Sequence, residues 1–298
     1  MHIVNIIDTG LIMGLLLTSI VASLGISFRL LNFPDLTIDG SFALGAAISA
    51  TMVRNDYPVV FAVFISMFCG GLAGVATALL HTKLRINKFL SGIIVVTALY
   101  SVLIRIMKGG NISFGQRTTF FDFAGKYDSL NAFSFGTVFL LLIFSAFILF
   151  VAYVFLKSRY GIRLRAACLN TELAKSIGLN SSRSLIIGLF FTNILAAFSG
   201  TLFSLKSSYA DIGYMQGMLI VSLASLTIGE KIVPVKSLNK LTYVLLASVI
   251  GSIAYQIIWA VALKFNIEPT DLNLITALIV VGLFFWKRNN KNGSIELQ

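Results

Sequence analysis

Charged side chains are scarce in this sequence of 298 residues, at only 12% Asp, Glu, Lys and Arg. Hydrophobic residues make up 57%, and the mean hydropathy is +0.91. A soluble domain carries about twice that share of charge on its surface, so this composition excludes one. The apolar residues instead gather in runs long enough to cross a bilayer, which takes about 20 residues each. We therefore predict an all-α, polytopic integral membrane protein that forms one transmembrane domain over residues 1–298.

Cysteine and histidine are nearly absent, and this limits the chemistry that the chain can perform. Cys69 lies in an apolar run and Cys168 in a basic loop, so we expect no disulfide between them. Beside His2, His81 is the only other histidine, and its place at a membrane boundary is typical of an interfacial residue. The sequence has no GxxxxGK[ST], HExxH or GxSxG motif. We expect no catalytic residues, no metal site and no cofactor in this chain, which disfavours an intramembrane enzyme.

Nine apolar runs predict about eight to ten transmembrane helices. The first is retained as a mature helix because no Lys or Arg precedes Leu11, so a signal peptide's basic region is missing. The second and seventh runs are short for a full span, and each is expected to be tilted, re-entrant or broken. The runs are Ile6–Phe28, Gly40–Val53, Pro58–Leu80, Phe89–Met107, Gly136–Leu156, Leu185–Leu205, Gly213–Gly229, Leu241–Leu263 and Leu272–Trp286.

Lys and Arg are distributed unequally between the two sides of the predicted membrane. With the N-terminus outside, 16 basic residues fall on one side and 7 on the other. The larger set belongs in the cytoplasm, so we predict an outer N-terminus and a cytoplasmic C-terminus. This topology accounts for most of the net charge of +11, and no nucleic-acid partner is needed to explain it.

A break in the chain is predicted between the first two runs, in the segment NFPDLTIDGS from Asn32 to Ser41. Pro34 lacks a backbone donor and disfavours helix at the preceding residue. Acidic and hydroxyl side chains flank the break, and three of them, Thr37, Asp39 and Ser41, are possible N-caps of the next helix. A broken helix exposes polar groups to a substrate path in many transporters. The alternative is an ordinary interfacial turn with two solvated acids, Asp35 and Asp39.

The central loop from Lys157 to Arg183 carries six basic residues and one acid, Glu172. Asn170 or Thr171 can cap a short helix, and Gly178 can end it in a left-handed conformation after about two turns. Residues 180–182 can then cap the next membrane helix. The predicted product is a compact helix over Thr171–Ile177 on the cytoplasmic surface. It either contacts a cytoplasmic partner or is a surface helix without one.

The outer loop from Lys108 to Ser134 is polar and contains glycine, with Asp122 and Asp128. It is either a solvated connector or a docking surface for an extracytoplasmic protein.

Three stretches resemble the permease subunits of bacterial ABC importers, in the branch that transports branched-chain amino acids and simple sugars. They are RLLNFPDLTIDGSFALGAA, HTKLRINKFLSGIIVVTALYSVLIRIM and SRYGIRLRAACLNTELAKSIGLNSSRSLIIGLFFTNILAAFSGTLFS. Within the last, Glu172, Ala174 and Gly178 match the Glu-x-Ala-x-x-x-Gly pattern of the loop that contacts the ATPase. The sequence of the segment NFPDLTIDGS is most similar to that of a subgroup of tryptophan/tyrosine-type importers. The C-terminal third departs from the family pattern in LASLTIGEKIVPVKS, so no gating role is transferred to Thr227–Pro234.

The resemblance implies a transport subunit, without its own ATPase motif, in the bacterial plasma membrane. Its implied partners are two copies of an ABC ATPase that binds ATP, a second permease chain in a homodimer, a substrate-binding protein outside the cell and a small solute, which the subgroup resemblance implies is an aromatic amino acid. The predicted substrate-pathway residues are Asn32, Asp35, Thr37, Asp39 and Ser41, and those predicted for ATPase coupling are Asn170, Thr171, Glu172, Ala174 and Gly178.

An ion-coupled secondary transporter is the main alternative, with Asp35 or Asp39 coupling to protons or sodium. Such a mechanism needs an acid at the bilayer midplane. The sequence places the acids near the apolar runs at the ends of those runs, which disfavours this alternative.

Overall fold

The structure is a computed structural model that describes residues 2–115, 117–128, 133–176, 178–234 and 239–264. Helices dominate these residues, which confirms the predicted all-α polytopic class. The long helices are α1 (His2–Gly25, continued by a π-helical turn at Ile26–Leu30), α2 (Thr37–Arg54), α3 (Val59–Thr82), α4 (Lys88–Met107), α6 (Phe135–Lys157), α9 (Ser181–Ser207), α10 (Met218–Ile232) and α11 (Lys240–Lys264). The short elements are α5 (Phe120–Asp128), α7 (Arg159–Leu169), α8 (Thr171–Ser176), β1 (Asn111–Ser113) and β2 (Tyr209–Asp211).

Each of the first eight predicted apolar runs falls on one of the long helices. Among the described residues, six helices are long and apolar enough to cross a membrane, namely α1, α3, α4, α6, α9 and α11. The two exceptions are α2 and α10, with 18 and 15 residues, which correspond to the two runs predicted to be short. The ninth run, Leu272–Trp286, lies outside the described residues.

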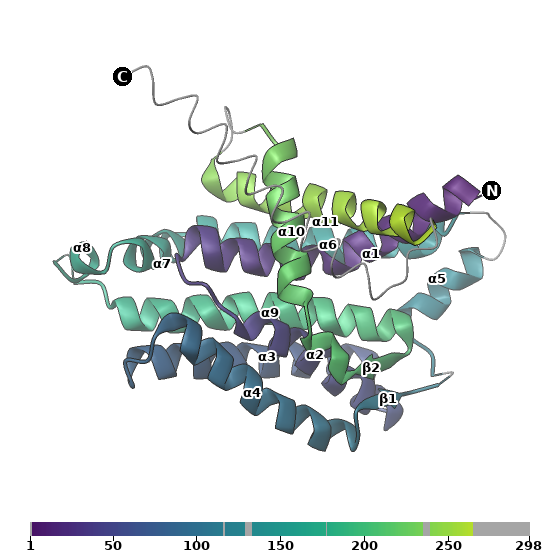
Figure 1. The fold of residues 1–298 in the computed structure, drawn as a ribbon, viewed down its shortest axis with the longest axis horizontal. Coiled ribbons are helices and arrows are strands. Elements are labelled where there is room, and N and C mark those ends of the chain that lie inside the picture. The colour runs from purple at the N-terminus through teal and green to yellow at the C-terminus, as the bar shows by residue number, and fades with distance from the viewer. Residues whose placement is uncertain (1, 116, 129–132, 177, 235–238, 265–298) are drawn as a thin grey trace.

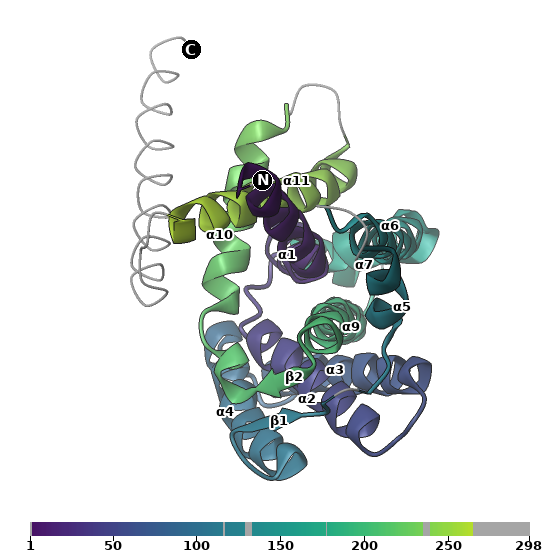
Figure 2. The ribbon, with the colours of Figure 1, turned by 90° about the vertical axis from the view of Figure 1, so that its right-hand side faces the viewer.

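The helices form a bundle in which α1 and α9 occupy the centre. In end view, α9 lies between α1 on one side and α2 and α3 on the other (Figure 2). In the apolar stretch of α1, 83% of the residues are buried, whereas in that of α6 only 22% are. The outer faces of α3 and α6 expose large apolar side chains suited to lipid, among them Phe61, Phe64, Phe139 and Phe147.

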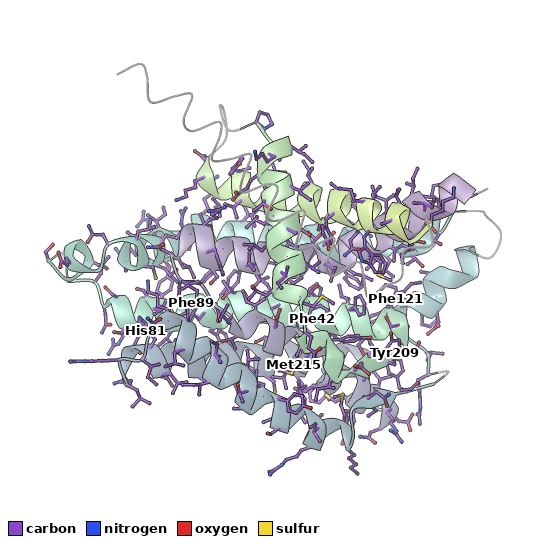
Figure 3. All side chains as sticks on the ribbon, viewed as in Figure 1. Phe42, His81, Phe89, Phe121, Tyr209 and Met215 are labelled. Atoms are coloured by element: carbon purple, nitrogen blue, oxygen red, sulfur yellow. The ribbon has the colours of Figure 1, made fainter. Side chains whose placement is uncertain are left out.

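The two ends of the bundle differ in structure (Figure 1). Helices α7 and α8 project at one end, which we call the loop end. At the opposite end, which we call the strand end, β1 pairs antiparallel with β2, and α5 lies at the same end beside α6. Helix α10 runs steeply across the other helices between these ends. Side-chain positions follow this division, since His81 and Phe89 lie toward the loop end and Phe121 and Tyr209 toward the strand end (Figure 3).

Glycine allows the central helices to approach one another closely. A Cβ added at Gly45 would collide with the backbone of Ala197 in α9, and one at Gly74 would collide with the backbone of Leu189. Gly200 of α9 would meet the backbone of α2 in the same way. Small residues at helix contacts are the usual device for packing in lipid.

The outer loop from Lys108 to Ser134 has secondary structure of its own. Ile112 of β1 is paired with Ala210 of β2, and both side chains are buried. Arg117 forms an ion pair with Asp56, which follows α2. The described part of the loop is therefore anchored to two other parts of the strand end.

Candidate functional site

The predicted break between the first two helices is present, and it begins inside α1. The last turn widens to a π-helix, where the Leu31 N–H donates to the Ile26 carbonyl at 3.0 Å. Asn32 then adopts a left-handed conformation with φ of +50°. Residues 31–36, which we call the break, are not helical. A π-turn leaves backbone groups outside the regular helical pattern, and such turns are frequent at functional sites.

Asp35 lies in the break with its side chain completely buried. Its Oδ1 accepts a hydrogen bond from the Thr37 N–H at 2.9 Å, and its Oδ2 accepts one from Asn193 Nδ2 at 2.6 Å. The first bond satisfies the start of α2, so the prediction that Thr37, Asp39 or Ser41 is the N-cap was wrong. Those three residues belong to α2 itself, and the carboxylate that precedes them supplies the cap.

The same network continues into α2, α3 and α9. Ser41 Oγ donates to Asn193 Oδ1 at 2.6 Å, and the hydroxyls of Thr37 and Thr77 are 2.5 Å apart. All of these side chains are fully buried. We call the five residues the Asp35 network: Asp35, Thr37, Ser41, Thr77 and Asn193.

The position of the Asp35 network corrects an expectation about depth. Asn193 lies near the middle of α9, so the Asp35 carboxylate that it contacts lies well inside the bundle rather than at the end of a span. The break therefore folds inward from the end of α1. The argument that all acids near the apolar runs lie at their ends does not hold for Asp35. Among the described residues, no Lys or Arg forms an ion pair with it, so amide, hydroxyl and backbone donors alone offset its burial.

Asp39 has a different environment from Asp35, although only four residues separate them. It lines a pocket of about 270 Å³ between α2, α4 and α10, which we call the Asp39 pocket. Its Oδ1 is buried without a hydrogen-bond partner in the described part of the chain. Asn32 is also apart from the Asp35 network, and its carbonyl accepts a hydrogen bond from Lys88 Nζ at 3.0 Å. Of the predicted pathway residues, the structure thus brings together Asp35, Thr37 and Ser41.

Arg29 and Glu230 join the end of α1 to the end of α10. Arg29 Nε and Nη2 donate to the two carboxylate oxygens of Glu230 at 2.6 and 2.7 Å. Tyr243 of α11 donates its hydroxyl to the Glu230 carbonyl at 2.7 Å. Bidentate pairs of this kind fix orientation as well as distance, so three helices are held together beside the break.

The central loop contains the predicted short helix, here α8. Asn170 has an extended conformation, and its carbonyl accepts the Ala174 N–H at 3.0 Å, so the backbone identifies Asn170 rather than Thr171 as the N-cap position. Gly178 has φ of +78°, and the Leu179 N–H donates to the Ala174 carbonyl at 2.8 Å. This is the hydrogen bond of a Schellman motif. The start and the end of the helix therefore agree with the prediction.

Two features make α8 a rigid projection of the bundle. Ala174 is 1% exposed, whereas Glu172 points to solvent. The chain enters through α7, which packs on α6 and α9, and leaves through Asn180, whose side chain accepts the Arg183 N–H at 3.0 Å at the start of α9. The predicted cap of α9 is thus confirmed. The sequence interpretation did not define α7, which Ser158 caps through the Gly161 N–H.

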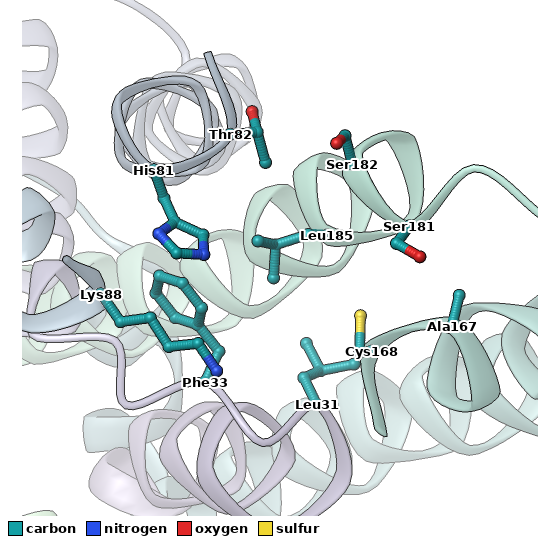
Figure 4. Close-up of a pocket in the computed structure, with 10 residues that line it drawn as sticks. All are labelled: Leu31, Phe33, His81, Thr82, Lys88, Ala167, Cys168, Ser181, Ser182 and Leu185. Carbon is teal, nitrogen blue, oxygen red and sulfur yellow. The ribbon is translucent and has the colours of Figure 1, made fainter. Parts of the chain in front are cut away.

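A second pocket, of about 250 Å³, lies at the loop end between the break, α3, α7 and α9 (Figure 4). Lys88 lies over the Phe33 ring, and His81 meets the edge of the same ring. His81 Nδ1 is 2.7 Å from the Ile86 carbonyl, which agrees with an interfacial, structural role. Cys168 also lines this pocket, and burial raises the pKa of its thiol to about 11.

No group of three or more His, Cys, Asp or Glu that could hold a metal ion occurs in the described ranges. Asn193 is the main residue that the sequence interpretation missed. An amide inside an otherwise apolar span is the signal that could have identified it, because polar side chains at that depth require a partner.

Comparison with known proteins gives a consistent result over nearly the whole chain. Residues 6–285 match the family described as the permease component of branched-chain amino acid transport systems. The tyrosine transport system permease protein of Clostridioides difficile (strain R20291) is 31% identical over 285 residues, or 95% of this chain and 91% of the relative. An uncharacterized protein of Rickettsia prowazekii (strain Madrid E) is 29% identical over 278 residues, or 93% of this chain and 95% of the relative. No solved structure matches the chain.

Proposed function

The chain belongs to the family of branched-chain amino acid transport system permease components, and from this membership we propose that it forms the membrane path of an ABC importer for an aromatic amino acid. The observation that carries the proposal is the match over residues 6–285 together with the folded loop at α7 and α8. The aromatic class is supported by the 31% identity to a tyrosine transport permease. The chain itself supplies no catalysis in this proposal.

The break and the Asp35 network are the proposed path-forming elements. They combine an interrupted helix with buried hydroxyl, amide and carboxylate groups, which is how transporters present polar groups to a solute within the bilayer. Asn32 and Asp39 are outside this network, since the Asn32 carbonyl accepts a hydrogen bond from Lys88 and Asp39 lines the Asp39 pocket. We assign all five predicted residues, Asn32, Asp35, Thr37, Asp39 and Ser41, to the path or its gate.

Helix α8 is the proposed contact for a separate ATPase that binds ATP. Its exposed Glu172 and buried Ala174 give it an outer and an inner side, and its capped ends at Asn170 and Gly178 make it rigid. Charge supports an orientation, because the described part of the loop end includes the basic helix α7 and the Lys83–Lys88 turn, and this end would face the cytoplasm of a bacterial plasma membrane. The strand end would then face an external substrate-binding protein.

Two permease chains and two ATPase subunits complete the proposed assembly. The Asp35 network is buried within a single bundle, with α1 and α9 at its centre. A path between two chains also needs a surface of the bundle that both chains share. The face that carries α4 and α10 is the candidate, because the Asp39 pocket lies there. Mass measurement of the purified complex with its ATPase checks this, and a monomeric permease in that complex would contradict the homodimer.

The function itself is tested in proteoliposomes that contain the permease, its ATPase and its binding protein. We expect uptake of L-tyrosine that requires ATP inside the vesicles and the binding protein outside them. A matched preparation with an ATPase variant that cannot hydrolyse ATP is the control. Uptake that persists with this variant and follows an imposed proton or sodium gradient would contradict the proposal in favour of a secondary transporter.

A further inference from the structure

The Asp39 pocket has one charged group and walls that are mostly apolar. Asp39 stands in the first turn of α2, and the pocket extends from it between α4 and α10. Its walls include Leu36, Ile93, Val96 and Ile220. A cavity that combines hydrocarbon walls with one carboxylate fits a solute with an apolar body and one positive group.

The Asp39 carboxylate has an unmet hydrogen-bonding capacity. Its Oδ1 is buried and has no partner within the described ranges, while the carboxylate lies beside the backbone of Leu219 at the start of α10. A buried acceptor without a donor destabilises a protein more than a hydrogen bond stabilises it. The arrangement is therefore incomplete among the described residues, and a donor from a bound solute would complete it.

We propose that Asp39 binds the ammonium group of the transported solute, with the solute's apolar side chain against the walls of the Asp39 pocket. The inference rests on the proposed function, since it names the chemical group by which this path recognises its solute. A charge-assisted hydrogen bond from N⁺–H to a carboxylate inside a bundle is stronger than one between neutral groups. It also supplies the donor that Oδ1 lacks.

A metal cation fits this pocket less well than an ammonium group. Sodium, calcium and magnesium ions take several oxygen ligands, and no group of three or more His, Cys, Asp or Glu that could hold a metal occurs in the described residues. Thr97, the hydroxyl residue of the pocket, already donates to the Ile93 carbonyl at 2.8 Å. Most of the remaining wall is hydrocarbon, which an apolar solute covers and a hydrated ion does not.

A purely structural role for Asp39 is separable from solute binding by the choice of substitution. Asp39→Asn keeps an oxygen acceptor beside Leu219 but removes the charge. Asp39→Glu keeps the charge and shifts it by one methylene. Asp56→Asn, at an exposed carboxylate on the strand end, is the matched control for loss of one negative charge.

The test is equilibrium binding to the purified permease–ATPase complex in lipid nanodiscs without the binding protein. The probes are L-tyrosine, tyramine and 3-(4-hydroxyphenyl)propanoate, which share the ring and differ in the amine and the carboxylate. We expect Asp39→Asn to weaken binding of both amines by about tenfold or more and to leave binding of the deaminated acid unchanged. Asp56→Asn should bind all three probes as the wild type does, and Asp39→Glu should retain part of the amine preference.

Several outcomes would overturn the inference. Equal binding of amines and deaminated acid by the wild type, or an equal loss of all three probes in Asp39→Asn, would assign Asp39 a structural role. Loss of the permease dimer in Asp39→Asn would assign it to a contact with a basic group of the second chain. If L-tyrosine uptake is normal in Asp39→Asn, the inference fails and the proposed function stands. If the wild type takes up no L-tyrosine in proteoliposomes, both fail.

Discussion

Asp35 and Asn193 are 158 positions apart in the chain, and a hydrogen bond of 2.6 Å joins their side chains. Asn193 belongs to α9, which begins directly after the loop that contains α8. Any displacement of α8 that moves α9 along or about its axis therefore acts on the break through this bond. The contact provides a physical link between the proposed ATPase contact and the proposed path.

The first prediction removes this link. Asn193→Ala deletes the donor to Asp35 and the acceptor for Ser41, which leaves a buried carboxylate oxygen and a buried hydroxyl without those partners. We expect the free energy of unfolding to fall by about 1–3 kcal/mol and uptake to fall more than ATPase activity. Thermal unfolding of the purified protein and uptake in proteoliposomes measure the two effects. Ser49→Ala is the control, because its buried hydroxyl bonds only within α2, and a stability loss equal to that of Asn193→Ala would contradict the prediction.

Much of the fold was predictable because apolar periodicity and length decide which segments cross a membrane. The helices α3, α4, α6, α9 and α11 begin and end within a few residues of the predicted runs. The caps of α8 and α9 were also predictable, since Asn170, Gly178 and Asn180 have strong local preferences. These features depend on residues close together in the chain.

The path site was only partly predictable because its partners are remote in sequence. Pro34 and the glycine-bearing segment after it indicated the break, but nothing local indicates that Asp35 turns inward to reach Asn193. For the same reason the N-cap of α2 was assigned to Thr37, Asp39 or Ser41 rather than to the Asp35 carboxylate. Asp39 is separated from Asp35 because it lies in the first turn of α2 and lines the pocket between α2, α4 and α10. The residues near Asp39 in the sequence do not indicate which helices pack around it.

Close packing of α3 on α9 gives the second prediction. Gly74 has no room for a side chain, because a Cβ there would collide with the Leu189 backbone. Gly74→Val should therefore separate the two helices and lower the thermal unfolding temperature, with a cost of about 1–3 kcal/mol or more from overpacking. Gly110→Val is the control, since nothing lies within 4 Å of a Cβ at that position. Equal unfolding temperatures for the two variants would show that this contact is not as close as the structure has it.

The third prediction concerns the thiol of Cys168 at the loop end. Burial raises its pKa to about 11, so the neutral thiol dominates at pH 7 to 9 and the thiolate forms only as the pH approaches 11. The thiolate is the reactive form. In a Cys69→Ala background, we expect alkylation by N-ethylmaleimide at pH 8 to be on the order of a hundredfold slower than for an ordinary cysteine with a pKa near 8.5.

The pH profile of that reaction is the decisive measurement. Its rate should rise about tenfold per pH unit from pH 7 to 10 and level off near 11, because each unit raises the thiolate fraction tenfold. A short cysteine peptide under the same conditions is the control. A plateau below pH 9 would mean that the thiol is not buried as described.

The fourth prediction separates the two acids of the break. Asp35→Asn replaces one acceptor oxygen with a donor that faces either Asn193 or the Thr37 N–H, so one of its two hydrogen bonds is lost. We expect the variant to assemble with the ATPase and to transport poorly. Asp39→Asn should assemble as well and also transport poorly, without the stability loss of Asp35→Asn. Normal transport by both variants would return the segment to an ordinary interfacial turn.

The last prediction concerns coupling at α8. A chain without a phosphate-binding loop must receive work mechanically, and α8 is held as a rigid element by its cap at Asn170 and its left-handed end at Gly178. A Cβ at Gly178 meets no other atom within 4 Å, so the cost of Gly178→Val is conformational, about 1 kcal/mol or more for a side chain at φ of +78°. That strain falls on the turn that sets the orientation of α8, and we expect ATP hydrolysis to continue while uptake is lost.

Glu172→Lys should have the same effect, because it reverses the charge of an exposed side chain in the first turn of α8. Gly178→Asn is the matched control, since asparagine tolerates the left-handed region and should keep most of the uptake. ATPase activity and uptake are measured on the same reconstituted complex, and wild-type uptake by both Gly178→Val and Glu172→Lys would remove α8 from the coupling pathway.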